Sequence, residues 1–341
     1  MLHKLNGLSA FAAAVLALAP FAAAQGNPES DYGNPLDPQV VASSGGGARY
    51  SWMNLAANGT GRSRPGGNWV GAKFYLIGGE TTGGGRASVV EIFDGPTMAW
   101  GPSFSVMPIA VSNIMGATAA VGSKIYVFGG YDVTAAFRAE VQIYDTATDT
   151  WATGPTAIPG GGRYGALAVR ISANTIFLAG GAKVGSIPTT ECYRYDTTTH
   201  TFTADTAMTA ARYLLTGTYA SSTNRVYAVG GFGTGTSFQY YDPVGMTWNN
   251  LPNIPVDRAG CGVVAVGPYV LTYGGNWGVW NNTTDLFNST TGLWAPVSPI
   301  PNMNVARRAF AYGLFDNGSI RAALASDGWL GAYSNANEVL H

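Results

Sequence analysis

Arginines recur in this sequence, each a few residues ahead of an apolar run. The set is Arg62, Arg163, Arg212, Arg258 and Arg308, with Arg307 as an equal candidate for the last place and Asn113 at the equivalent place between the first two. A guanidinium group stays charged and presents a fork of donors that fits carboxylate, sulfate or phosphate. If the apolar runs are equivalent strands, these donors gather into one anion-binding ring. The alternative is structural, with each guanidinium bonded to loop carbonyls or to the neighbouring repeat.

Three tryptophans follow similar apolar runs and would lie beside those arginines: Trp277, Trp280 and Trp329. Aromatic rings next to cations form a stacking platform for a sugar ring or for an aromatic side chain of a peptide. The alternative is packing between repeats, because aromatic side chains supply much of the buried apolar area in proteins. We therefore expect an arginine- and aromatic-lined mouth, with architecture as the competing use of the same residues.

Side chains that hold metals or act as nucleophiles are scarce. His3, His200 and His341 form no pair for copper or zinc, and no Ser–His or Cys–His couple can be assembled at the mouth. Cys192 and Cys261 fall on strands of different repeats, so we expect two free, buried thiols rather than a disulfide. We expect neither a metal nor a cofactor.

Carboxylates could reach the same mouth, namely Glu80, Asp132, Asp257 and Asp327. Two of them could serve as a general acid and base. Each also has a simpler use, in a turn or in an ion pair with an arginine. The residues alone leave both uses open.

The elements that must position these residues repeat with a period of about fifty residues. Three landmarks keep their order in five copies: a diglycine (Gly78-Gly79, Gly129-Gly130, Gly180-Gly181, Gly230-Gly231, Gly274-Gly275), an aromatic–acid pair (Phe93-Asp94, Tyr144-Asp145, Tyr195-Asp196, Tyr241-Asp242, the weaker Phe287-Asn288) and a late aromatic (Trp100, Trp151, Phe202, Trp248, Trp294). The strand run from Ile125 to Phe128 is apolar at every position, which predicts that both of its faces are covered.

In these landmarks the chain resembles the kelch repeat, from about residue 48 to the end. The resemblance implies an all-β propeller whose blades each hold four antiparallel strands around a central channel. It also implies that the loops entering the inner strands and the loops after the diglycines form a face that binds partners. Copper-radical oxidases built on kelch propellers need a Cys–Tyr pair and two histidine ligands, and this sequence departs from that pattern.

Complete repeats span about 62–107, 113–158, 163–208, 212–254 and 258–301, and residues 307–341 supply three further strands. The stretch from Tyr50 to Leu55 resembles a last strand with no repeat before it. We expect it to pair with residues 337–340, so that the N-terminal strand closes a ring of six blades over residues 48–341. In the sixth copy, Ala325-Ser326 stands where a diglycine is expected.

The N-terminus has the pattern of a secretory signal peptide over residues 1–24: a basic start, an apolar core and small residues before Gln25. Residues 25–47 are rich in proline and glycine and are expected to form a flexible leader. We therefore expect a secreted, periplasmic or cell-surface protein. No segment reaches the length of about 20 apolar residues that a membrane span needs.

The formal net charge is −1, which gives no general attraction for nucleic acid. The leading hypothesis is a monomeric binding module whose mouth recognises an acidic or polar ligand, either a glycan or a carboxylate of a protein partner. One alternative is a sugar-modifying enzyme, an epimerase, mutarotase or lyase acting on acidic sugars. Another is a surface or matrix scaffold.

Overall fold

A computed structural model describes residues 50–317 and 320–341. Within these ranges the chain consists of antiparallel strands and two short 3₁₀ turns, η1 (Thr82–Gly84) and η2 (Val184–Ser186). The expected signal peptide and leader lie outside the described residues. No helix in the described part is long and apolar enough to cross a membrane.

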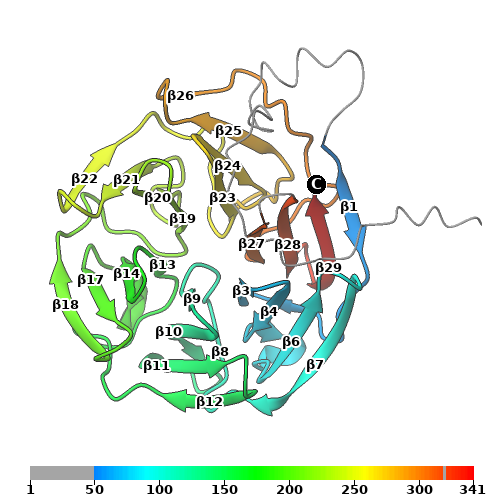
Figure 1. The fold of residues 1–341 in the computed structure, drawn as a ribbon, viewed down its shortest axis with the longest axis vertical. Coiled ribbons are helices and arrows are strands. Elements are labelled where there is room, and N and C mark those ends of the chain that lie inside the picture. The colour runs from blue at the N-terminus through cyan, green and yellow to red at the C-terminus, as the bar shows by residue number, and fades with distance from the viewer. Residues whose placement is uncertain (1–49, 318–319) are drawn as a thin grey trace, which may run out of the picture. The chain divides into compact units, whose positions relative to one another are not determined.

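Six four-stranded blades surround a central channel (Figure 1), which confirms the expected fold class. The first blade holds β3 (Gly66–Val70), β4 (Lys73–Ile77), β6 (Val89–Asp94) and β7 (Ala99–Val106). The second holds β9 (Thr118–Val121), β10 (Lys124–Asp132), β11 (Phe137–Asp145) and β12 (Thr150–Thr153). The third holds β13 (Leu167–Arg170), β14 (Thr175–Ala179), β17 (Cys192–Asp196) and β18 (Thr201–Asp205).

The remaining blades follow the same order from the channel outwards. The fourth holds β19 (Thr216–Ala220), β20 (Arg225–Val229), β21 (Phe238–Asp242) and β22 (Thr247–Asn250). The fifth holds β23 (Gly262–Val266), β24 (Tyr269–Tyr273), β25 (Thr284–Asn288) and β26 (Leu293–Trp294). The sixth holds β27 (Ala311–Asp316), β28 (Arg321–Trp329), β29 (Tyr333–Leu340) and the N-terminal β1 (Trp52–Leu55).

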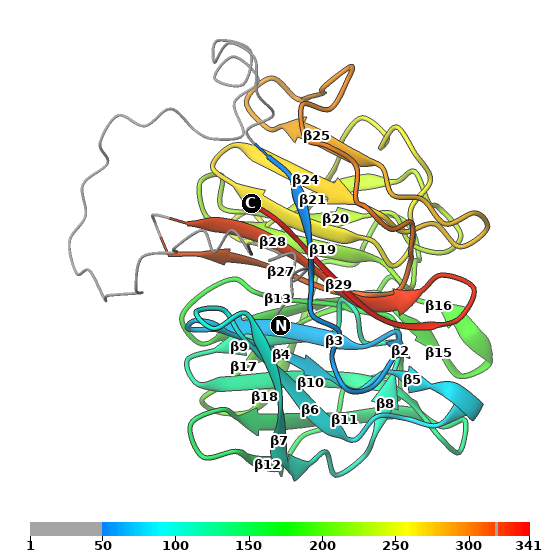
Figure 2. The same ribbon diagram turned by 90° about the vertical axis from the view of Figure 1, so that its right-hand side faces the viewer.

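Short additional strands mark one face of the ring, which we call the loop face. They are β2 (Arg62–Ser63), β5 (Glu80–Thr81), β8 (Val111–Ser112), β15 (Ala182–Lys183) and β16 (Ile187–Pro188), and Figure 2 shows them along the same side of the propeller. The loops that follow the diglycines end on this face, as does each link from one blade to the next. The predicted mouth residues are therefore carried by the loop face.

Second strands are covered on both faces, as the apolar run Ile125–Phe128 predicted. Ile125, Val127 and Phe128 are fully buried, because a neighbouring blade packs on each side of the sheet. The aromatic landmarks fill the space between blades: Tyr144 lies 5.1 Å from Trp151 in its own blade and 5.8 Å from Tyr75 in the preceding one, between ring centroids. The repeat pattern thus encodes the contacts that stack one blade on the next.

The ring is closed as expected by the N-terminal strand. β1 pairs antiparallel with β29, and the register runs from Trp52 opposite Leu340 to Leu55 opposite Asn337. The Trp52 indole also donates a hydrogen bond of 2.9 Å to the Pro301 carbonyl in the adjoining link. Strand β29 begins at Tyr333, earlier than expected, so it also reaches the loop face and pairs with β2.

The sixth blade keeps the diglycine geometry two residues beyond the expected place. Asp327 and Gly328 have φ angles of 64° and 112°, matching 62° and 100° at Gly78 and Gly79. Ala325 and Ser326 instead continue the ladder with β29. The expectation that Ala325-Ser326 replaces the diglycine was wrong, because an aspartate adopting the left-handed conformation concealed the motif. The two cysteines are free and buried, as predicted.

Candidate functional site

The ring arginines use their guanidinium groups inside the blades. Arg163 and Arg212 are fully buried, and each donates from Nη1 to the carbonyl of the first diglycine residue, at 3.4 Å to Gly180 and 3.0 Å to Gly230. Their Nη2 atoms reach a side chain near the third strand, Glu191 at 2.8 Å and Gln239 at 2.7 Å. The same arrangement recurs at Arg62 with Gly78 and Glu91, at Arg258 with Gly274 and Asp285, and at Arg307 with Asp327 and Glu338.

These contacts correct the picture of guanidinium groups aimed into the channel mouth. Each arginine joins a diglycine turn to the third strand of its own blade. The Nε atom has no partner among the described residues in four of them: Arg163, Arg212, Arg258 and Arg307. The ring arginine of the sixth blade is Arg307, not Arg308. The contacts favour the structural alternative for Arg62, Arg163, Arg212 and Arg258, whose use by a ligand remains a prediction without a supporting contact.

Asn113 is not the counterpart of Arg62. It belongs to a second set of residues, each two positions after a ring arginine or its replacement in the second blade. All members of this set have a positive φ between 53° and 63°: Arg64, Asn113, Gly165, Leu214, Gly260 and Ala309. The residue that replaces the arginine in the second blade is Val111, whose carbonyl accepts from Gly79 as the Arg163 carbonyl accepts from Gly130. The two sets lie only two residues apart along the chain, so spacing in the sequence alone does not separate them.

Backbone hydrogen bonds join this second set into a closed circle, which we call the mouth belt. The donors and acceptors run in order: Arg64 N to Ala309 O (2.7 Å), Ala309 N to Gly260 O (2.8 Å), Gly260 N to Leu214 O (3.0 Å), Leu214 N to Gly165 O (2.8 Å), Gly165 N to Asn113 O (2.8 Å) and Ile114 N to Arg64 O (3.3 Å). Met115, Leu214 and Ala309 are buried together at this level. The belt ties the six blades together and narrows the channel at the loop face.

Aromatic rings line the loop face next to the belt, and we call them the aromatic crescent: Tyr131, Tyr164, Tyr213, Phe232 and Trp277. Successive ring centroids lie 5.7, 5.6, 5.2 and 6.4 Å apart, so the crescent crosses four blades without a break. Phe232 is 43% exposed, whereas Tyr164 is buried. The crescent is therefore fixed in the fold at Tyr164 and open to solvent at Phe232.

Two arginines lie over the Trp277 ring at the end of the crescent. Arg308 Cζ is 4.0 Å and Arg64 Cζ is 5.4 Å from the ring centroid. Arg308 also donates to the Trp277 carbonyl, and Arg64 forms an ion pair with Glu80. Burial lowers the pKa of Arg308, and the like charge of Arg64 lowers it further. This arrangement leaves two cations close together, and of the two only Arg64 is in an ion pair among the described residues.

The other predicted tryptophans lie near this pair but outside the crescent. Trp280 is 37% exposed and its ring approaches Gly331, in the turn between β28 and β29. Trp329 stacks edge-on against Tyr333 at 5.0 Å, and its backbone pairs with Arg308. Of the eight predicted site residues, the structure thus brings Arg308, Trp277, Trp280 and Trp329 to one side of the loop face.

Apolar side chains extend the exposed surface beyond the aromatic rings. Val133, Val184, Ile187 and Val279 are between 64% and 78% exposed, and all four lie in loops that follow a diglycine. Solvent-exposed apolar groups gathered on one face mark an interaction surface more often than scattered ones do.

Three of the four carboxylates of the acid–base alternative already have partners: Glu80, Asp132 and Asp327. Asp132 accepts hydrogen bonds from Thr134 and from the Ala136 backbone, which lower its pKa against the opposing effect of burial. Glu80 accepts from Arg64 and from the Tyr333 hydroxyl at 2.7 Å. Asp327, the first residue of the sixth diglycine turn, is buried and lies 3.4 Å from Arg62. Within the described residues, no group of three or more His, Cys, Asp or Glu could hold a metal ion.

Sequence reasoning missed Arg64, Tyr164 and Tyr213. A signal was present: Tyr164 and Tyr213 directly follow ring arginines, just as Arg308 follows Arg307. In the first and fifth blades the residue after the ring arginine is Ser63 or Ala259, and both are buried. The signal therefore marks only the third, fourth and sixth blades, and it does not identify Arg64.

Comparisons with known proteins agree with this architecture. The family model described as the KLHDC2/KLHL20/DRC7 Kelch-repeats domain matches residues 117–320. Kelch-like protein 25 of Xenopus tropicalis is 31% identical over 192 residues, which are 53% of this chain and 31% of that protein. The chain therefore spans about a third of the length of this curated relative.

Proposed function

The chain belongs to the kelch-repeat family, and from this premise we propose that it is a protein-interaction module whose partner docks on the aromatic crescent of the loop face. Kelch-repeat propellers are typical protein-interaction modules. In this proposal a carboxylate of the partner, from an acidic side chain or a chain end, is received between Arg64 and Arg308.

The observation that carries the proposal is the position of the two guanidinium groups over Trp277. Burial lowers the pKa of Arg308 and the like charge of Arg64 lowers it further, so an anion placed between the two groups would relieve their repulsion. A carboxylate bound by arginine makes charge-assisted hydrogen bonds, which are stronger than neutral ones. Glu80 already occupies one side of Arg64, and an incoming carboxylate therefore has Arg308 as its principal partner.

The surroundings of this anion site favour a peptide over a free glycan. Exposed apolar side chains continue from the crescent to Val133, Val184 and Ile187, which suit apolar side chains of a partner. Aromatic and arginine residues are also the types that dominate binding energy at protein interfaces. A glycan would use the rings but would leave these aliphatic groups exposed.

An immobilised array of random peptides, probed with the full chain, tests the proposal. Each sequence would be printed with a free carboxylate and as its amide-capped, Asn/Gln-substituted counterpart, and acidic and neutral glycans would be printed beside them. The test variant is Arg308→Gln. Its matched control is Arg225→Gln, because Arg225 also lies 4.0 Å from an aromatic centroid, that of Tyr240, but away from the crescent.

We expect acidic peptides to bind the wild-type chain and the Arg225→Gln variant equally. Arg308→Gln should weaken them by about tenfold, the effect of one charge-assisted hydrogen bond. Equal binding of acidic and amide peptides would remove the carboxylate from the proposal. Binding to glycans alone would replace the peptide partner with a sugar.

We also propose that the propeller acts outside the cytoplasm, on the strength of the signal-like pattern in residues 1–24. N-terminal sequencing of the protein exported by its native host should give Gln25 as the first residue. An intact Met1 on the mature protein would contradict this.

A further inference from the structure

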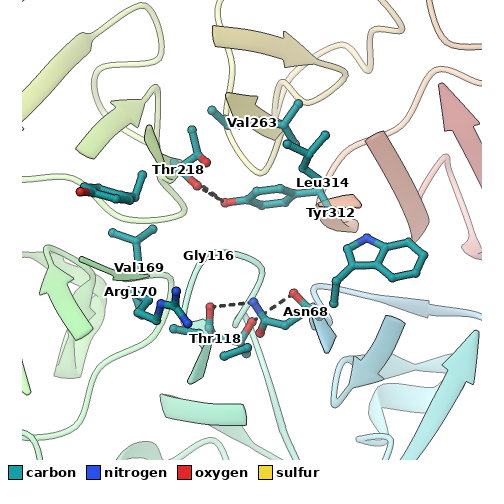
Figure 3. Close-up of a pocket in the computed structure, with 18 of the residues that line it drawn as sticks. Asn68, Gly116, Thr118, Val169, Arg170, Thr218, Val263, Tyr312 and Leu314 are labelled. Carbon is teal, nitrogen blue, oxygen red and sulfur yellow. Dashed lines mark hydrogen bonds between the residues drawn. The ribbon is translucent and has the colours of Figure 1, made fainter. Parts of the chain in front are cut away.

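A cavity of about 320 Å³ occupies the channel on the other side of the mouth belt. Inner strands of all six blades line it, and Figure 3 shows it in close-up. It begins at Met115, two residues past Asn113 of the belt, and extends to Arg170 at the end of β13. Arg170 lies five residues beyond Gly165, about 16 Å along an extended strand. The cavity is thus separate from the aromatic crescent.

Tyr312 braces this cavity from one side. Its hydroxyl donates to the Gly217 carbonyl and accepts from the Gly217 amide, both at 3.0 Å, so it links β27 to β19 across the intervening fifth blade. Figure 3 shows the Tyr312 ring opposite a wall formed by Arg170, Thr118 and Asn68. A brace of this kind holds the cavity at a fixed width.

Arg170 gives the cavity its charge. It is the one charged residue in the lining, it is exposed, and it takes part in none of the ion pairs among the described residues. In Figure 3 its guanidinium lies beside Thr118. A cavity with one guanidinium and no carboxylate selects a monoanion over a neutral or cationic molecule.

Two lining residues of the first blade also carry polar atoms without partners. Asn68 Oδ1 and Trp69 Nε1 are both buried and have no hydrogen-bond partner among the described residues. The hydroxyl groups of Thr118 and Thr218 add further polar positions to the lining.

We propose that this cavity binds a small polyhydroxylated carboxylate, no larger than a hexuronic acid. The carboxylate lies on Arg170, and ligand hydroxyl groups bond to the polar lining residues Asn68, Thr118 and Thr218. The cavity volume is at the lower end of the range for small-molecule sites, which limits the ligand to about one sugar ring. The binding is non-covalent and does not depend on the crescent.

Isothermal titration of the full chain with D-glucuronate, and separately with D-glucose, tests the charge requirement. The first variant is Arg170→Gln, with Lys124→Gln as its control, because Lys124 is an exposed cation at the start of β10 and not part of the lining. The second variant is Thr218→Trp, which fills the cavity and keeps the charge.

Glucuronate should bind the wild-type chain and Lys124→Gln alike, and Arg170→Gln and Thr218→Trp should each weaken it by at least about tenfold. Glucose should bind at least about tenfold more weakly than glucuronate. Equal affinity for the two sugars, or an Arg170→Gln variant that binds as the wild type does, would overturn the proposal. A complete lack of glucuronate binding would also overturn it. None of these results would bear on the proposed peptide site, which the Arg308→Gln variant tests separately.

Discussion

Trp52 lies opposite Leu340 in the ladder between β1 and β29, so the first and last described strands form one sheet. The Trp52 ring is 7% exposed and its centroid is 5.2 Å from that of Tyr273 in the fifth blade. One side chain therefore connects the N-terminal strand both to the C-terminal strand and to the preceding blade. A ring closed in this way leaves no open edge between its first and last blades.

Replacing Trp52 with alanine should lower the free energy of unfolding by about 3–5 kcal/mol, the usual cost of truncating a buried aromatic residue. Met53→Ala is the matched control, because Met53 is in the same strand and 39% exposed. Urea denaturation followed by tryptophan fluorescence and by circular dichroism measures both. Similar losses in the two variants would show that the closure does not depend on the Trp52 contacts.

Arg307 and Arg308 are adjacent in sequence and opposite in role. Arg307 and Glu338 are both fully buried and joined at 2.6 Å, so Arg307→Met would leave a buried carboxylate without its cation. We expect a loss of about 3–5 kcal/mol in the free energy of unfolding. Arg308→Met should change it by less than about 1 kcal/mol, because Arg308 lies at the surface over Trp277. Chemical denaturation distinguishes them, and a reversed order would reject the assignment of Arg307 to the structural ring.

The mouth belt requires glycine at Gly165 for reasons of space as well as of conformation. Its φ is 63°, and an added Cβ would lie 2.7 Å from the Leu214 amide nitrogen, which donates to the Gly165 carbonyl. Gly71 has a φ of 58° and open space around it. Gly71→Ala should cost about 1–2 kcal/mol, the left-handed penalty alone.

Gly165→Ala should cost more than Gly71→Ala, by about 1 kcal/mol or more, because the belt hydrogen bond must also be displaced. Thermal unfolding of the two variants, with hydrogen exchange at the Leu214 amide, measures the difference. Equal stability and an unchanged Leu214 exchange rate would mean that the belt can absorb the methyl group.

Asp327 makes stability depend on pH in an unusual direction. Burial raises its pKa well above the usual value; Arg62, 3.4 Å away, opposes the rise, and the nearby Glu91 carboxylate adds to it. The folded protein therefore holds a proton that the unfolded chain releases at lower pH. The stability from this group is present below the unfolded-state pKa and is lost as the pH rises through the folded-state pKa.

Asp327→Asn removes this titration. Relative to the variant, the wild-type free energy of unfolding should fall as the pH increases across that window, by up to about 1.4 kcal/mol per pH unit. Asp316→Asn serves as control, since Asp316 is an exposed acid of the same blade. Denaturation curves recorded from about pH 4 to about pH 9 supply the test, because this range starts near the ordinary pKa of aspartate and extends well above it. Parallel curves for wild type and Asp327→Asn would contradict the raised pKa.

The sequence by itself determined the repeat, the fold class, the number of blades and the closing strand. Each of these follows from local features: a diglycine that needs positive φ, an aromatic that packs against the next blade, and a fourth strand missing from the last copy. Such features depend on neighbours along the chain and on copies of themselves. They can therefore be recognised by comparing the chain with itself.

Only the tertiary structure decided which charged groups remain at the surface. Arg307 and Arg308 are the same residue type in adjacent positions, and their roles differ because Arg307 bonds to Asp327 and Glu338 inside the blade whereas Arg308 lies over Trp277. Likewise, Asp327 could be placed in the sixth diglycine position only from its φ angle. The mouth belt and the Arg170 cavity each join residues from several blades, so no single repeat encodes them, and they exist because the ring closes.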